Sequence, residues 1–306
     1  MTRDLTAVID LDTPASSDRP ILDVSVVAAN YNNANFLHDF FDAWLSSTAM
    51  PSELIFVDDG STDNSVEIAR LYLSKIPSLQ IIELQENKGF GNALNVGIDR
   101  ATCKYLARID PDDVVVADRL AKQILELESG RADVVGSNAY IFQSSGARVV
   151  GVSNFPRDHS MIEVAITRGE HGVLHPTVTA RTSLFRENKY VQSNVPAEDY
   201  DIFARMLRSG ARFHNIQEPL LRYRVHQRSA SNILPFSTIE RTYRIRDEIF
   251  GTRTSRTAVR LYYWHIKFYR KHLFAQRRSK RLFYLALASG LRPDKAVRRV
   301  IRSLRK

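Results

Sequence analysis

Short apolar runs alternate with longer amphipathic segments along the first third of the chain. The apolar runs predict buried strands at residues 24–29, 54–57, 79–84 and 105–109. Between them, apolar side chains recur every three or four positions and predict helices at residues 36–45, 66–73 and 92–101. This order predicts an α/β fold with a mostly parallel, Rossmann-like sheet flanked by helices.

The pattern becomes less regular after Asp113. We expect helices near residues 118–129, 158–168 and 198–209, a strand near 212–217, and apolar positions at 134–135 that lead to an antiparallel ribbon over 139–152. Proline, serine and aspartate mix without period at the start of the chain, and the segments after about residue 237 are helical and basic. The predicted organisation is a flexible leader over residues 1–20, a main domain over 21–235 and a basic helical region over 236–306.

Charge is distributed unevenly along the 306 residues. Lys and Arg number 26 against 33 Asp and Glu in residues 1–252, but 17 against 1 in residues 253–306, so the net charge of +9 belongs to the end of the chain. Aromatic and basic side chains are interleaved over residues 259–271, and apolar residues recur at helical spacing between arginines over residues 297–304. Two interpretations stay open: an in-plane helix on anionic lipid, or a helical cap packed on the main domain. Nucleic acid suits the charge less well, because no recognised nucleic-acid module accompanies it.

The sequence also indicates the compartment. Cys103 is the only cysteine, so no internal disulfide can form, which fits a reducing cytoplasm. No apolar stretch approaches the roughly 18 to 20 residues of a spanning helix, and the first residues lack a secretory signal. We therefore expect a soluble cytoplasmic protein, or a peripheral one at the inner face of the cell membrane.

Polar clusters follow three of the predicted strands, at residues 30–33, 58–63 and 110–113. The carboxyl ends of parallel strands meet at one edge of a sheet, which is where ligands bind. Asp110 and Asp112 lie two positions apart and can face one hard cation such as Mg²⁺ or Mn²⁺, whose sites are commonly completed by phosphates. Aspartate and proline also suit a turn, but three such clusters at one edge favour a ligand site.

The chain resembles family 2 glycosyltransferases, which have the GT-A fold. The matching segments are 24–33, 57–63, 87–98, 108–113, 197–201 and 223–226, in the order of the family. On the donor side, the resemblance implies that Asn30 and Tyr31 form the base pocket and that Asp59 accepts the N3–H of uracil. It further implies that Lys88 contacts nucleotide or phosphate, and that Asp110 touches the ribose. Asp112 and His226 would bind the divalent metal beside the diphosphate.

On the acceptor side, the resemblance implies that Asp199 is the general base. Glu198 would support the loop or contact the acceptor, and His175 would lie on the acceptor side, although a hydrogen-bonded structural histidine suits its position equally well. Arg222, Arg224 and Arg228 are further candidates for binding diphosphate, ranked after His226.

These implications add up to an inverting, metal-dependent glycosyltransferase. It would move a sugar from a nucleotide-sugar, with UDP expected, to a hydroxyl of a glycan or lipid-linked acceptor. One alternative is a nucleotidyltransferase acting on sugar phosphates; another is a catalytically silent, nucleotide-binding protein at a membrane. The choice between Mg²⁺ and Mn²⁺ stays open.

Overall fold

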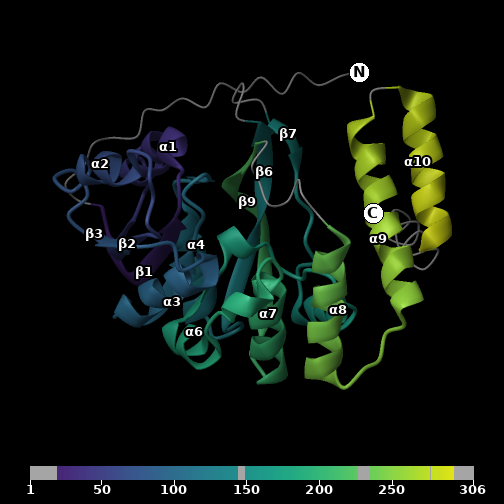
Figure 1. Cartoon of the computed structure of the whole chain (residues 1–306). Helices are drawn as coiled ribbons and strands as arrows, with labels where there is room; N and C mark the ends of the chain where they lie inside the picture. The colour runs from purple at the N-terminus through teal and green to yellow at the C-terminus, as the bar shows by residue number, and fades with distance from the viewer. Residues whose placement is uncertain (1–18, 144–148, 227–234, 276, 293–306) are drawn as a thin grey trace.

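A nine-stranded sheet with helices on both faces forms the centre of the molecule (Figure 1). The computed structural model describes residues 19–143, 149–226, 235–275 and 277–292. The strand order is β3-β2-β1-β4-β8-β6-β9-β5, and β7 pairs with β6 beside this path.

The first four strands pair in parallel, as the apolar runs predict. They are β1 (Ile21–Asn30), β2 (Met50–Asp58), β3 (Leu79–Glu83) and β4 (Tyr105–Arg108), and the helices between them are α1 (Ala34–Leu45), α2 (Ser65–Arg70) and α3 (Phe90–Arg100). Gly97 lets α3 lie close to β1, because a Cβ there would come within 2.4 Å of Val27 Cγ1. Alternate β1 residues then enter two cores, Val27 on the α3 side and Val26 on the α1 side.

The second half of the sheet is mixed. Its elements are β5 (Val114–Val115), α4 (Arg119–Glu128), β6 (Val134–Gln143), β7 (Val149–Val152), α5 (His159–Thr167), β8 (Thr179–Arg181), α6 (Thr182–Asn188), α7 (Glu198–Arg208) and β9 (Phe213–Val225), with short 3-10 turns at His175–Thr177 and Gln192–Asn194. β6 and β7 are antiparallel and confirm the predicted ribbon. β8 is antiparallel to β4, and β9 is parallel to β6.

Two sequence-based boundaries were wrong. The helix predicted over residues 66–73 ends at Arg70, and Leu71 and Leu73 are exposed. Tyr72 is buried instead, because its ring stacks on Phe41 at 4.7 Å and its hydroxyl donates to Asp42 Oδ1 at 2.9 Å.

The second wrong boundary concerns β9, which continues to Val225 rather than ending near residue 217. β9 contains Pro219, which has no N–H to donate to a neighbouring strand. Two shifts in the β6 register, on either side of Asn138, accommodate this irregular part of the ladder.

Three helices follow the sheet: α8 (Phe236–Phe250), α9 (Arg256–Phe274) and α10 (Arg278–Leu291). α8 packs against α7, and α9 and α10 form a hairpin at the edge of the molecule farthest from β3 (Figure 1). Residues 1–18 of the predicted leader, the diphosphate candidate Arg228 and the apolar pattern over 297–304 lie outside the described residues, and the division into domains stays a prediction. Within the described residues, no helix is both long enough and apolar enough to cross a bilayer.

Candidate active site

The carboxyl ends of β1 and β2 carry the first predicted residues. Asn30 pairs in register with Asp58 and donates from Nδ2 to its carboxylate at 2.8 Å. Asp58 also accepts from the backbone N–H of Ser61 at 2.8 Å. Asp58 thus stabilises the turn after β2. The Tyr31 side chain beside it is 47% exposed, so its ring is accessible.

Asp59 holds the loop before α3. Its two carboxylate oxygens accept from the backbone N–H groups of Lys88 at 2.8 Å and Gly89 at 2.9 Å, and the side chain is buried. Gly89 precedes α3 with a φ of 92°, a conformation that favours glycine. The Lys88 side chain is exposed. Asp59 therefore has a structural task besides the base contact that the sequence predicts for it.

An acidic cluster lies after β4, where the sequence predicts the metal. One carboxylate oxygen from each of Asp110, Asp112 and Asp113 lies within 4.8 Å of the others. His226, from the end of β9, brings its Nε2 to 2.9 Å from Asp112 Oδ2. The His226 ring also packs on Phe36 of α1 with centroids 4.8 Å apart. The fold thus places the two predicted metal ligands side by side.

Arg108 is a buried cation next to this cluster, with a side chain that is only 2% exposed. Both terminal nitrogens of its guanidinium bond to the carboxylate of Asp110. Burial, opposed by Arg108 and reinforced by Asp112, raises the pKa of Asp110 to about 6. Arg108 fixes the direction of Asp110 and offsets part of the charge that the three carboxylates bring together.

Arg224 supports the same cluster from β9. Its backbone N–H donates to Asp113 Oδ1 at 2.8 Å, and its Nε donates to the Asp112 carbonyl oxygen at 2.7 Å. Its Nη2 donates to Asp39 of α1 at 2.7 Å, and the side chain is only 6% exposed. A buried, engaged guanidinium is not free to bind diphosphate, so that suggestion for Arg224 was wrong.

These donors fit a hard or borderline divalent cation. Asp113 Oδ2 is buried and finds no hydrogen-bond partner among the described residues, and burial beside Asp112 raises the Asp113 pKa well above its usual range. A cation in the cluster would give this oxygen a partner and would offset the repulsion between the carboxylates. Carboxylate oxygens and an imidazole nitrogen are the ligand types that Mn²⁺ accepts, and the oxygens alone suit Mg²⁺.

A second acidic pair begins α7. Glu198 is 8% exposed, its Oε2 has no partner within the described part of the chain, and burial followed by the charge of Asp199 raises the Glu198 pKa to about 8. Asp199 is more accessible, with 26% of its side chain exposed. Its Oδ1 accepts from the Tyr200 N–H at 2.7 Å, and its Oδ2 lies 3.4 Å from His171 Nδ1. The first turn of α7 therefore presents the accessible carboxylate of Asp199 beside the buried carboxyl group of Glu198, while the third acid of this turn, Asp201, is paired with Arg205.

His175 is buried among aromatic side chains. Its Nε2 lies 2.7 Å from the Tyr190 hydroxyl, and Phe90 and Phe203 meet its ring edge to face. Burial, followed by the charge of Arg108, lowers the pKa of His175 well below its usual range. His175 is thus a neutral, hydrogen-bonded histidine, and its predicted acceptor-side contact stays a prediction.

The two acidic groups interact electrostatically. Arg108 and Asp110 both act on the Glu198 carboxyl, and Asp199 acts on Asp110. Sequence reasoning assigned no role to Arg108 or His171. The signal for Arg108 was its position at the end of an apolar strand, because a buried charge needs a partner. The signal for His171 was the presence of histidines in the loop after α5.

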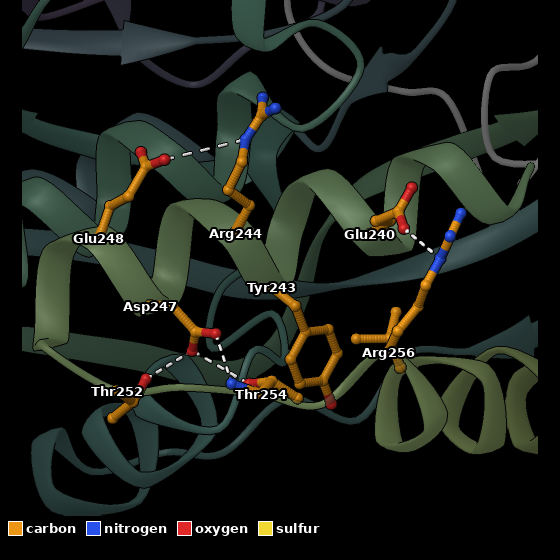
Figure 2. A pocket seen from close by; sticks show the side chains of 9 residues that line it. Glu240, Tyr243, Arg244, Asp247, Glu248, Thr252, Thr254 and Arg256 are labelled. Atoms are coloured by element: carbon orange, nitrogen blue, oxygen red, sulfur yellow. Dashed lines mark hydrogen bonds and ion pairs between the residues drawn. The ribbon is translucent and has the colours of Figure 1, made fainter.

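A separate hollow of about 450 Å³ opens between α8 and the start of α9 (Figure 2). Its lining residues are Glu240, Tyr243, Arg244, Asp247, Glu248, Thr252, Thr254, Arg256 and Val259. Its charged groups are engaged by neighbouring groups. Arg256 Nε lies 3.1 Å from Glu240 Oε1, and the Asp247 carboxylate accepts hydrogen bonds from the Thr252 hydroxyl and the Thr254 backbone N–H. No predicted site residue lines this hollow, and the chemistry concentrates at the strand ends.

Comparison with known proteins decides the family. The family model described as Glycosyl transferase family 2 matches residues 25–193. The chain belongs to this family. Family 2 proteins are enzymes that transfer glycosyl groups, so the nucleotidyltransferase and silent-protein alternatives are set aside.

Named relatives agree with this membership. Over 206 residues the chain is 33% identical to the putative glycosyltransferase EpsE of Bacillus subtilis, a match that covers 66% of this chain and 72% of that protein. It is 27% identical over 207 residues to the amylovoran biosynthesis glycosyltransferase AmsE of Erwinia amylovora, covering 65% of this chain and 75% of that protein.

Solved structures identify the fold as GT-A. Staphylococcus aureus TarS 1–349 in complex with UDP-GlcNAc matches with a TM-score of 0.61 and 17% identity, covering 90% of this family 2 chain and 82% of that one. The mannosyltransferase PcManGT of Pyrobaculum calidifontis, in complex with GDP-Man and Mn²⁺, matches with a TM-score of 0.53 and 18% identity, covering 96% and 84%. The predicted fold class is confirmed.

Proposed function

We propose that this enzyme transfers a sugar from a nucleotide-sugar, preferentially a UDP-sugar, to an acceptor hydroxyl with inversion at the anomeric carbon. The proposal rests on the presence of two separate acidic groups. Asp112 lies beside His226 at the end of β4, and Asp199 lies at the start of α7. One group suits a departing diphosphate, and the other suits an attacking hydroxyl. We further propose that residues 21–235 form the catalytic domain and residues 236–306 a basic helical region.

On the donor side, the carboxyl ends of β1 and β2 would hold the nucleoside. The exposed Tyr31 ring can stack on the base, an interaction worth about 1–3 kcal/mol. Asp59 would accept the uracil N3–H, since each carboxylate oxygen can accept more than one hydrogen bond. Asp110, oriented by Arg108, would accept from a ribose hydroxyl. TarS, a structural neighbour, binds UDP-GlcNAc, which supports this class of donor.

The metal would be held by Asp112 and His226, with Asp113 as a further oxygen donor behind them. A divalent cation there would act as a Lewis acid that stabilises the negative charge on the departing diphosphate. PcManGT, with the same fold, binds GDP-Man together with Mn²⁺, which supports a metal at the corresponding strand ends.

On the acceptor side, Asp199 would take the proton of the attacking hydroxyl. The acceptor oxygen forms a bond to the anomeric carbon while the bond from that carbon to the diphosphate oxygen breaks, so the configuration inverts in one displacement. A protonated Glu198 would add no second negative charge beside the base. We propose a glycan or lipid-linked acceptor, reached by a peripheral enzyme at the inner membrane face; the relative AmsE is named for amylovoran biosynthesis.

Donor hydrolysis tests this proposal. The protein is incubated with UDP-, GDP-, CDP- and dTDP-sugars, with Mn²⁺, with Mg²⁺ and with a chelator, and the released nucleotide and the anomer of the product are determined by chromatography and NMR. We expect metal-dependent release of UDP and an inverted anomer. Asp112→Asn should lose this activity, whereas Asp99→Asn, an exposed carboxylate of α3, should keep it. Release of pyrophosphate, or a retained anomer, would contradict the proposal.

A further inference from the structure

The helix α9 has two chemically different faces. The inner face is buried: Val259 and Tyr262 pack with Tyr243 of α8, and the His265 Nδ1 lies 2.8 Å from the Ala288 carbonyl oxygen of α10. At the end of α10, Arg292 lies 3.6 Å from Glu170 and over the Tyr262 ring. The α9–α10 hairpin is therefore anchored to the protein along one side.

The outer face of α9 is both apolar and basic. Leu261 is 44% exposed and Trp264 50% exposed, and Arg260, Lys267 and Lys271 recur with them at helical spacing. The rings form a continuous row across the hairpin: Trp264 stacks on Phe268 at 5.8 Å, and Phe268 on Tyr284 of α10 at 6.4 Å. This row joins the outer faces of the two helices into one surface.

The helix α10 continues this surface with larger apolar groups. Phe283 is 60% exposed, and Leu287, one turn later on the same face, is also exposed. The basic residues of α10 cluster at its beginning, where Arg278, Lys280 and Arg281 follow Arg277. Apolar side chains thus lie beside cationic ones along α9 and at the beginning of α10.

Charge identifies the kind of partner. Residues 256–292 contain ten Lys and Arg residues and no Asp or Glu. A second copy of the same surface would repel this one, and a nucleic acid would leave the exposed Phe283 and Leu287 without an apolar partner. Anionic lipid offers negative headgroups and an apolar layer at adjacent depths, which is where Trp and Tyr side chains accumulate and Lys and Arg side chains reach toward the headgroups.

We propose that the outer face of the α9–α10 hairpin, defined by Leu261, Trp264, Phe268, Phe283 and Leu287 with the surrounding lysines and arginines, docks flat on an anionic lipid bilayer. The proposal assigns the peripheral location proposed above to a definite surface, and it does not depend on the transfer chemistry. The inner-face contacts hold this surface in a fixed orientation relative to α8. The enzyme would therefore approach the membrane in one defined pose rather than through a flexible basic tail.

Vesicle co-sedimentation of the full chain tests the proposal. Vesicles of phosphatidylcholine with increasing phosphatidylglycerol should bind increasing fractions of the protein, and salt should weaken that binding. The double variant Trp264→Ser/Phe283→Ser should bind at least about tenfold more weakly, because two large apolar groups no longer leave water. Leu125→Ser is the matched control, since Leu125 is 72% exposed on α4.

The charge contribution is tested separately. Arg278→Glu/Lys280→Glu should also reduce binding, whereas Lys75→Glu, an exposed lysine after α2, should not. Circular dichroism and the hydrolysis of free donor should match the unmodified protein in every variant. Unchanged vesicle binding in the Trp264/Phe283 variant overturns the proposal, as does equal binding to purely zwitterionic vesicles. Dimerisation in light scattering that this variant abolishes would assign the surface to a second copy instead. Binding without donor hydrolysis would contradict the proposed function and leave the docking surface standing.

Discussion

His226 Nε2 lies 2.9 Å from Asp112 Oδ2, although 114 positions separate the two residues in the chain. The end of β9 carries His226 to this point, and the Phe36 ring of α1 packs on its imidazole. Arg224, two residues earlier, bonds to the Asp112 carbonyl oxygen and to Asp113. The last strand of the sheet is thereby tied to the acidic cluster at the end of β4.

This contact predicts a joint role of the two side chains in metal binding. We expect Asp112→Asn to abolish the metal dependence of UDP binding and His226→Ala to weaken metal affinity by about 10–100-fold, because a cation site depends strongly on each donor. Isothermal titration of UDP at several Mn²⁺ concentrations measures both. His38→Gln, an exposed histidine of α1, serves as the control. Unchanged Mn²⁺ dependence in both site variants would remove these residues from the metal site.

The sequence predicted the parallel strands and the edge at which the site lies, because both follow from local patterns. Asp110 and Asp112 could also be placed together, since they share one short turn. The contact between His226 and Asp112 could be expected only from the resemblance to a family, because it depends on the pairing of β9 with β5, which are far apart in the chain. The position of Arg108 at the end of an apolar strand was a signal that it is buried, but the sequence did not identify Asp110 as its partner, since pairing inside a fold depends on tertiary neighbours.

Asp199→Asn should separate binding from chemistry. The amide keeps the shape of the side chain and its contact with the Tyr200 N–H but cannot take a proton from the acceptor. Transfer should fall by about 10²–10⁴, the usual contribution of a general base, while UDP affinity stays close to that of the unmodified protein. Timed transfer assays measure the rate, and titration with UDP measures the affinity. Turnover near the original value would exclude Asp199 as the base.

Replacing His171 should lower the rate of transfer less than replacing Asp199 does, when both are measured in the same assay. Its Nδ1 lies 3.4 Å from Asp199 Oδ2, so it can orient the carboxylate without contacting the reacting atoms. We expect His171→Gln to lower the turnover number, to leave the Michaelis constant for donor unchanged, and to alter the pH profile of transfer. An identical pH profile would mean that His171 has no part in positioning the base.

Tyr31 and Asp59 should differ in their effect on base choice. Tyr31→Ala should weaken UDP and CDP binding alike, by about 1–3 kcal/mol, because stacking does not distinguish the two pyrimidines. Asp59→Ala should reduce the preference for UDP over CDP and also loosen the loop at Lys88 and Gly89, whose N–H groups it accepts. Competition titrations measure the preference, and proteolysis of the loop measures the second effect. An Asp59→Ala protein that still prefers UDP as strongly would leave Asp59 with the structural task alone.

Glu198 should make folding stability depend on pH. Burial and the neighbouring Asp199 raise its pKa to about 8 in the folded protein, whereas an unfolded glutamate titrates near its ordinary value of about 4.3. Between these two values the folded state binds more protons than the unfolded state, so stability is fully present below the lower value and falls as pH rises toward 8.

Glu198→Gln removes the titrating group and should therefore remove this decline. We expect the variant to gain roughly 1–3 kcal/mol over the unmodified protein at pH 8, and the difference to shrink toward pH 5. Urea unfolding at both pH values, with chelator and without nucleotide, measures the free energy of unfolding of each protein. Glu163→Gln, on the exposed side of α5, provides the matched control. The difference in free energy of unfolding between Glu198→Gln and the unmodified protein could instead be the same at pH 5 and pH 8. Glu198 would then be ionised over that whole range, and the proposal that it is neutral beside Asp199 would be wrong.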